Sequence, residues 1–372
     1  VGEVDLPQLS EDELKQVLAG QVVNAEFSVN TDSFVMAGAT TPDDLKTTLE
    51  LMTAYLREPG YREEAARLAR KYYAELDLRL NQTLEGIMGN RVDRYLADDS
   101  RFFGYPDIET FDAYTMDEVK SWLAQPLAEA YLEIAIVGDI TYEEALPLVA
   151  ATLGALPERA DTPEPFTKER ASVQFPAVSA ESGPKVFTYE TDLPRAAASV
   201  SWPTADFWDI QRTRRLSILA QILDDRMRIE VREKLGEGYS PYARNDGSEV
   251  FKDYGYLYAL NLCKPESTDA VAKLLTELGN DLGTGNVTQD ELDRALKPVL
   301  SMLKDYVRTN GYWLSRVLSQ SQQYPQSLDW ARTIQSDYAA ITVDELNALA
   351  KEYLGAHPGL AIIVRPEAAA SE

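Results

Sequence analysis

An internal repeat is the feature that most limits how this chain folds. Residues 115–119 (TMDEV) match residues 342–346 (TVDEL), an offset of 227 positions, and at the same offset Ile136-Val137 falls on Ile363-Val364. A helical stripe at Leu45, Leu49, Met52 and Leu56 maps at an offset of 226 onto Val271, Leu275, Leu278 and Leu282. The register drifts by only one position over about a hundred residues, which predicts two copies of one folding unit.

Each copy is predicted to contain the same order of elements. A strand pair is followed by a helix, a second and longer helix, a short helix near Thr115 or Thr342, and a last apolar strand. The expected ranges are 26–38, 42–57 and 61–80 in the first copy, and 252–264, 267–283 and 288–309 in the second. Thr288 and Glu291 have the spacing of a capping box at the start of the second long helix. This alternation predicts an α+β fold made of two α/β sandwich domains.

The repeat also sets the expected domain boundaries. We expect a first domain at 1–155, a Pro-rich linker at 156–184 and a second domain at 185–368. The second copy begins near Lys185, so the first copy is expected to begin about forty positions before Val1. The first domain is therefore predicted to lack its opening strand and helix, and the chain is predicted to be a fragment of a longer polypeptide.

The net charge of the chain limits which kinds of molecule it can bind. The 372 residues include 61 acids and 36 bases, a formal net charge of -25. Such a surface repels phosphate backbones, so we expect no nucleic-acid partner. Solubility is the first interpretation of this charge, and attraction of basic peptides is the second. No apolar run approaches the roughly 18 residues needed to cross a bilayer, so no membrane span is expected.

The inventory of catalytic side chains is short. The chain has one histidine, His357, in a turn-like sequence, and one cysteine, Cys263, in an apolar alternating run. A catalytic zinc needs about three protein ligands, and an inverted zinc motif needs two histidines within one helical turn. Glu75 is expected to be an ordinary carboxylate on the surface of a helix. The chain alone is therefore predicted to hold no metal and to be inactive.

Three motifs carry a resemblance to a known family. Residues 232–240 (REKLGEGYS) place Arg232 seven positions before Tyr239, after a long helix expected at about 206–231. Residues 136–140 (IVGDI) and 56–61 (LREPGY) agree with the same family. The chain resembles the C-terminal half of pitrilysin/insulinase-type (M16) zinc peptidases, in their bacterial PqqL-like branch.

The resemblance implies an architecture and a role. Members have four domains of the LuxS/MPP-like fold in two halves that enclose a chamber, and this chain corresponds to domains three and four. Zinc is expected in the missing N-terminal half, on the same chain or a partner subunit. This half is expected to bind peptide through Arg232 and Tyr239 and to close the chamber. A periplasmic location is expected from the resemblance alone. The alternative is a structural or assembly subunit of the same fold with no peptidase role.

An aromatic alternation is open to two interpretations. Tyr254, Tyr256 and Tyr258 alternate along an expected strand, so all three side chains lie on one face. They are either part of a peptide-binding chamber wall or a sheet face packed under helices. The sequence favours packing slightly.

Overall fold

A computed structural model describes residues 11–179, 183–191, 193–235 and 241–367. The chain forms two compact units, and neither is continuous in sequence. The first unit contains residues 1–75, 106–165 and 308–328, and the second contains residues 76–105, 166–307 and 329–372. The expected linker, 156–184, contains the change of unit at Pro165 and Phe166, and it also contains the short helix α9 (Thr167–Arg170).

The second unit is built on a five-stranded sheet with the order β3-β7-β4-β6-β5. Strands β3 and β7 are parallel and the other neighbours are antiparallel. The register sets Val200 between Ala259 and Ala361. The strands are β3 (Lys185–Tyr189), β4 (Ala196–Pro203), β5 (Tyr242–Gly247), β6 (Gly255–Cys263) and β7 (Leu360–Pro366).

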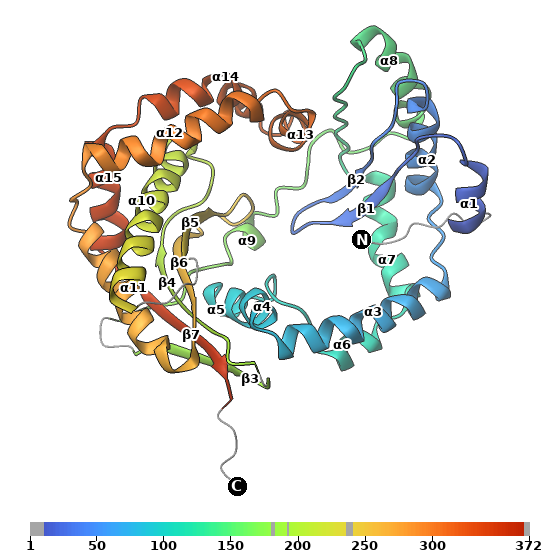
Figure 1. Ribbon diagram of the computed structural model, residues 1–372. Coiled ribbons are helices and arrows are strands. Elements are labelled where there is room, and N and C mark those ends of the chain that lie inside the picture. The colour runs from blue at the N-terminus through green and yellow to red at the C-terminus, as the bar shows by residue number, and fades with distance from the viewer. Residues whose placement is uncertain (1–10, 180–182, 192, 236–240, 368–372) are drawn as a thin grey trace. The chain divides into compact units, whose positions relative to one another are not determined.

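Helices cover one face of this sheet (Figure 1). The long helix α10 (Ile210–Leu235) and helix α11 (Thr268–Leu282) contribute nearly half of the buried residues of the main core. The predicted stripe on α11 is buried at all four positions, and Cys263 is buried beside it. Helix α12 (Gln289–Tyr306) begins at the predicted capping box, and α15 (Val343–Leu349), with the π-helix η5 (Ala350–Gly355), completes this layer. The short 3-10 helix η3 (Pro265–Ser267) leads into α11.

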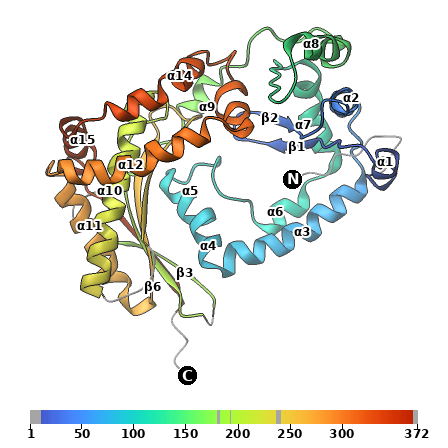
Figure 2. The ribbon, with the colours of Figure 1, turned by 45° about the horizontal axis from the view of Figure 1, so that its top comes forward.

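The opposite face of the same sheet carries a second apolar cluster. A short helical segment lies on it, formed by α4 (Leu84–Ile87), the π-helix η1 (Met88–Val92) and α5 (Asp93–Leu96). Its buried residues pack against Phe187, Tyr258 and Ile362 of the sheet. Figure 2 shows α4 and α5 on the side of the strands away from α10 and α11. The sheet is therefore buried on both faces, which suits its long apolar strands.

The first unit is mainly helical. A short hairpin, β1 (Glu26–Val29) and β2 (Phe34–Ala37), precedes helix α2 (Leu45–Arg57), whose Leu45 and Leu49 form a small core with Leu153. Helix α3 (Glu63–Gln82) continues from this unit into the second, and α14 (Gln326–Ala339) also spans both. The remaining elements are α1 (Glu11–Val17), α6 (Ile108–Ala113), α7 (Met116–Glu129), α8 (Tyr142–Ala151), η2 (Leu153–Ala155), α13 (Asn310–Tyr312) and the π-helix η4 (Trp313–Leu318).

One expected element does not form. Residues 131–137, which include Ile136 and Val137, are mostly apolar but belong to no strand. The corresponding strand β7 is held between β3 and β4. No described strand in the first unit pairs with residues 131–137, so no backbone ladder defines a strand there.

The observed helices follow the repeat offset closely. Helices α2, α3 and α7 match α11, α12 and α15 with η5, and Thr115 and Thr342 both form capping boxes. Thr83 and Thr309, 226 positions apart, each accept a hydrogen bond from the backbone N–H three residues later and precede a π-helix. The segment that begins at Thr83 belongs to the second unit, whereas the equivalent segment that begins at Thr309 belongs to the first unit. Each copy thus contributes this segment to the other unit.

Candidate functional site

The two predicted substrate-binding residues lie where the structure gives least detail. Arg232 is in the last turn of α10, but its side chain is outside the described part of the chain. Tyr239 falls in 236–240, outside the described residues. Helix α10 ends at Leu235, a few residues beyond the expected end at about 231. The roles of Arg232 and Tyr239 therefore stay predictions.

A buried carboxylate ties α10 to the strand that follows this motif. Asp224 accepts a hydrogen bond from the backbone N–H of Ala243 in β5 at 3.2 Å, and it also pairs with Arg228 one turn along α10. Burial raises the pKa of Asp224, while Arg228 and the Ala243 N–H oppose that rise. The contact fixes the start of β5 against α10. It also satisfies an outward-facing N–H of β5, the outermost strand of the sheet.

The predicted tyrosine alternation is confirmed on β6. The ring centroids of Tyr254 and Tyr256 are 6.1 Å apart, and those of Tyr256 and Tyr258 are 6.3 Å apart. Tyr254 and Tyr258 are buried, and the Tyr254 hydroxyl donates to the backbone oxygen of Leu96 in α5 at 3.1 Å. Of the two interpretations, packing under helices describes this face along most of its length.

Polar groups surround the outer part of the same face. In β5, Arg244 pairs with Asp246 at 2.8 Å, and its guanidinium lies 5.8 Å from the ring centroid of Tyr258. The register places Arg244 opposite Tyr258 and Asp246 opposite Tyr256. The side chain of Arg244 is 58% exposed and that of Asp246 is 34% exposed, so this end of the face is open to solvent.

Asp93 of α5 supplies a second carboxylate to this face. Burial raises the pKa of Asp93 to about 6, which Arg244 opposes and Asp246 reinforces. Burial also raises the pKa of Tyr254, Tyr256 and Tyr258, and the charge of Asp93 adds to each rise. Among the described residues, none donates a hydrogen bond to the Asp93 carboxylate. We define Asp93, Arg244, Asp246, Tyr256 and Tyr258 as the acidic tyrosine face.

Asp93, Arg244 and Asp246 were not among the residues predicted from the sequence to form a site. Arg244 and Asp246 alternate along β5 as the tyrosines do along β6, and that alternation was the signal available. Asp93 had no comparable signal, because its neighbours on β5 lie about 150 positions away in sequence. Only the packing of α5 on the sheet brings it there.

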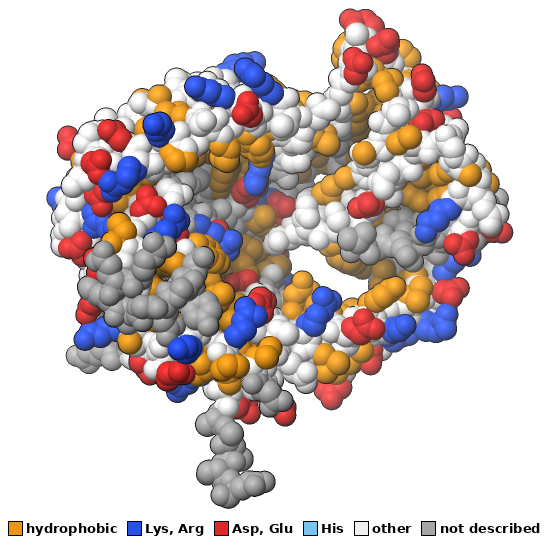
Figure 3. Space-filling view, in the orientation of Figure 1, with side chains coloured by type: hydrophobic (Ala, Val, Ile, Leu, Met, Phe, Trp, Pro, Cys, Tyr) orange, Lys and Arg blue, Asp and Glu red, His pale blue; other side chains and the backbone are white. Residues whose placement is uncertain are grey.

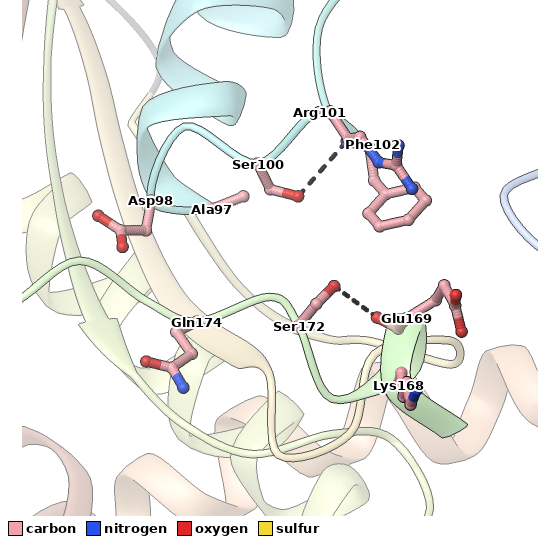
Figure 4. A pocket seen from close by; sticks show the side chains of 9 residues that line it. All are labelled: Ala97, Asp98, Ser100, Arg101, Phe102, Lys168, Glu169, Ser172 and Gln174. Carbon is pink, nitrogen blue, oxygen red and sulfur yellow. Dashed lines mark hydrogen bonds between the residues drawn. The ribbon is translucent and has the colours of Figure 1, made fainter. Parts of the chain in front are cut away.

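An open pocket lies beside α5 in the second unit (Figure 4). Its volume is about 590 Å³, and it is lined by the turn after α5, by α9 and by the segment that follows α9. Ser100 and Ser172 face each other across it, and both serines hydrogen-bond within their own segments. Cationic and anionic side chains both line it, namely Arg101, Lys168, Asp98 and Glu169. The pocket has no single charge preference.

The residues considered for zinc are not arranged as ligands. His357 is exposed in a bend before β7, and Glu75 is exposed on α3, as expected of an isolated loop histidine and a helix-surface carboxylate. Among the described residues, no group of three or more histidine, cysteine, aspartate or glutamate side chains could hold a metal ion. The described residues therefore do not fit a zinc site, and no chemical step is derived through zinc on this chain.

Two broader surface properties bear on partners. On the face drawn in Figure 3, acidic and basic side chains are interspersed, and acidic side chains gather at α8, whose first turn carries Glu143 and Glu144. No helix in the described part of the chain has the length and apolar character required to cross a membrane.

Comparison with known proteins defines the class. A family model described as the Peptidase M16 inactive domain matches residues 113–299, and the chain belongs to this family. The resemblance to M16 peptidases is therefore confirmed, and so is the expected α+β fold.

Individual relatives agree with this assignment. An uncharacterized zinc protease of Streptomyces coelicolor is 24% identical over 268 residues, covering 69% of this chain and 55% of the relative. The chloroplastic stromal processing peptidase of Oryza sativa subsp. indica is 21% identical over 394 residues, covering 93% of this chain and 31% of the relative. The chain thus spans about half or less of the length of these relatives.

Solved structures show the same fold. An M16 inactive domain from Pseudomonas fluorescens gives a TM-score of 0.77 at 17% identity, covering 99% of this chain and 87% of that one. The periplasmic protease PqqL of Escherichia coli gives 0.73 at 18% identity, covering 98% and 39%. The ferredoxin protease FusC, solved in complex with Arabidopsis ferredoxin, gives 0.75 at 16% identity, covering 99% and 39%.

Proposed function

We propose that this chain is the non-catalytic, substrate-binding and chamber-closing C-terminal half of a zinc-dependent metalloendopeptidase that acts on peptides. The observation that carries the proposal is the match of half of the chain to the M16 inactive domain, together with a relative named as a zinc protease. Zinc and the reacting groups would then belong to an N-terminal catalytic half, on the same polypeptide or on a partner subunit. The expected domains, 1–155 and 185–368 with a linker at 156–184, are part of this proposal.

Within this proposal, Arg232 and Tyr239 are the residues that reach the substrate. A guanidinium presents several donors in a rigid fork, which suits peptide carbonyls or a carboxylate. A tyrosine hydroxyl can donate to a carbonyl oxygen on which negative charge develops during hydrolysis. The Asp224 contact to Ala243 supports this arrangement, since it fixes the helix before the motif against the strand after it.

Peptide binding by the chain alone tests the proposal directly. A fluorescein-labelled extended peptide should show a saturable rise in anisotropy when titrated with the full chain. Arg232→Ala should weaken that binding, while Arg62→Ala, a control on the first unit before α3, should not. A structural or assembly subunit of the same fold would bind no peptide and would show no effect of Arg232→Ala. Absence of saturable binding for a panel of extended peptides would therefore favour that alternative.

A further inference from the structure

Among the described residues, the acidic tyrosine face carries two carboxylates, Asp93 and Asp246, against one guanidinium, Arg244. Arg244 is committed to Asp246 at 2.8 Å, which leaves the carboxylate of Asp93 as the second acid facing a single guanidinium. No described residue donates a hydrogen bond to Asp93, although a half-buried carboxylate normally has such partners. Among the described groups coupled to Asp93, Arg244 is the single cation, and Asp246, Tyr254, Tyr256 and Tyr258 are acidic or neutral. One added positive charge would balance the cluster.

A buried serine hydroxyl without a hydrogen-bond partner in the described part of the chain lies on the same side of the sheet. Ser201 of β4 pairs in register with Tyr258, so its side chain shares the face with Tyr258 and Arg244. Ser201 is fully buried, and its hydroxyl has no hydrogen-bond partner among the described residues. A buried hydroxyl without a partner marks a place where a further polar group or water belongs. This observation is independent of the charge of Asp93.

Ring faces and accessibility indicate the kind of ligand. Tyrosine rings attract a cation held over their faces, as Arg244 already lies against Tyr258. The entrance is open, since Arg244 and Asp246 are partly exposed and Tyr242 at the start of β5 is 41% exposed. The N–H of Ala243 on the outer edge of β5 is already bound by Asp224. A ligand at this face would therefore be recognised by the side chains of the face, and not by adding a strand to β5 at Ala243.

We infer that the acidic tyrosine face is a subsite for a basic side chain of a bound peptide, with Asp93 as its counter-ion and Tyr256 and Tyr258 as its aromatic wall. The inference rests on the proposed peptide-binding function and adds a preference for lysine or arginine to it. The chain's acidic balance favours the same class of peptide by long-range attraction.

Proton linkage gives the subsite a distinctive signature. The pKa of Asp93 is about 6, so a cation that binds the ionised carboxylate must compete with a proton below that pH. Affinity for a lysine-containing peptide should therefore fall about tenfold between pH 7.5 and pH 5, because only about a tenth of Asp93 is ionised at the lower pH. A peptide without the basic side chain should show no such fall.

The test uses two labelled peptides that differ at one position, lysine in one and norleucine in the other. Anisotropy titrations of the full chain at about pH 7.5 and about pH 5 should give a lysine preference of about tenfold or more at the higher pH only. Asp93→Asn should abolish both the preference and its pH dependence. Asp99→Asn, which removes the same charge from an exposed position six residues away, should leave both unchanged.

The outcomes separate the two proposals. Equal binding of both peptides, or a lysine preference that survives in Asp93→Asn, would overturn the subsite while peptide binding itself stands. Failure of both peptides to bind at either pH would overturn the subsite and the proposed function together. A lysine preference lost equally in Asp93→Asn and Asp99→Asn would show a general charge effect and would also overturn the subsite.

Discussion

Gly279 of α11 lies directly against the ring of Trp202 of β4, so close that a Cβ at Gly279 would be 2.0 Å from the Trp202 Cζ2 atom. Trp202 has no exposed surface, and it occupies the centre of the layer between the sheet and α11. The contact sets how closely this helix approaches the strands. The acidic tyrosine face lies on the opposite face of the same sheet, so the packing of α11 on the sheet supports it.

The first prediction concerns this contact. Gly279→Ala should lower the free energy of unfolding by about 1–3 kcal/mol, because the added methyl group overpacks a closed core and either the helix or the indole must move. Chemical denaturation followed by tryptophan fluorescence measures the change. Gly89→Ala is the matched control, since a Cβ at Gly89 meets nothing within 4 Å. Equal stability of the two variants would show that the α11 layer yields freely.

A second prediction concerns how the titration of Asp93 makes the stability of the protein depend on pH. Burial raises its pKa in the folded state to about 6, above the ordinary aspartate value of 3.8, so the folded protein binds the proton more tightly. The resulting stabilisation is fully present below about pH 4 and is lost as the pH rises through about 6. The free energy of unfolding of Asp93→Asn, relative to that of the wild type, should therefore rise by about 1 kcal/mol when the pH is raised from 5 to 7.5, after allowance for solvent screening.

The measurement is a pair of urea denaturation series at the two pH values. Asp99→Asn again serves as the control, and its difference from the wild type should not change with pH by the same amount. A destabilised Asp93→Asn at neutral pH would show that the carboxylate stabilises the fold. The expected result, a more stable variant that binds lysine peptides less well, is the pattern typical of a functional charge.

Much of the fold was predictable because the repeat is a property of the sequence. The stripe on α11 and the capping box at Thr288 each depend on local spacing, and the structure has both. The expected strand at Ile136-Val137 depends instead on distant partners, and it is not formed among the described residues. Strand formation is decided by pairing as much as by apolar pattern.

The candidate site was less accessible to sequence analysis. The tyrosine alternation on β6 was predictable, since period two is a local property. The covering of that face by α4 and α5 was not, because this segment belongs to the first copy of the repeat and packs in the second unit. Asp93 therefore reaches Arg244 through an exchange between copies, which no local pattern indicates. Arg232 and Tyr239 came from a family resemblance, and their roles stay predictions.

A third prediction concerns metal. The full chain, dialysed and analysed by mass spectrometry of its metals, should hold far less than one zinc per molecule, because zinc sites are built from about three protein ligands. Among the described residues, no such group exists. The same preparation should cleave no fluorogenic peptide. One tightly bound zinc per chain with cleavage that a chelator abolishes would contradict the assignment of this chain as the non-catalytic half.

The last prediction concerns Tyr239 and Arg232 in an enzyme assembled from this chain and its catalytic half. Tyr239→Phe removes one hydroxyl donor, and loss of one donor directed at the developing oxyanion lowers kcat by about 100-fold or more. Zinc content, folding and KM should stay close to those of the wild type. Arg232→Ala removes a donor that also holds the bound peptide, so both KM and kcat should change. Tyr72→Phe, at an exposed tyrosine of α3, is the control and should alter neither constant. Kinetics near the wild type for both Tyr239→Phe and Arg232→Ala would mean that these residues are structural and that this half only closes the chamber.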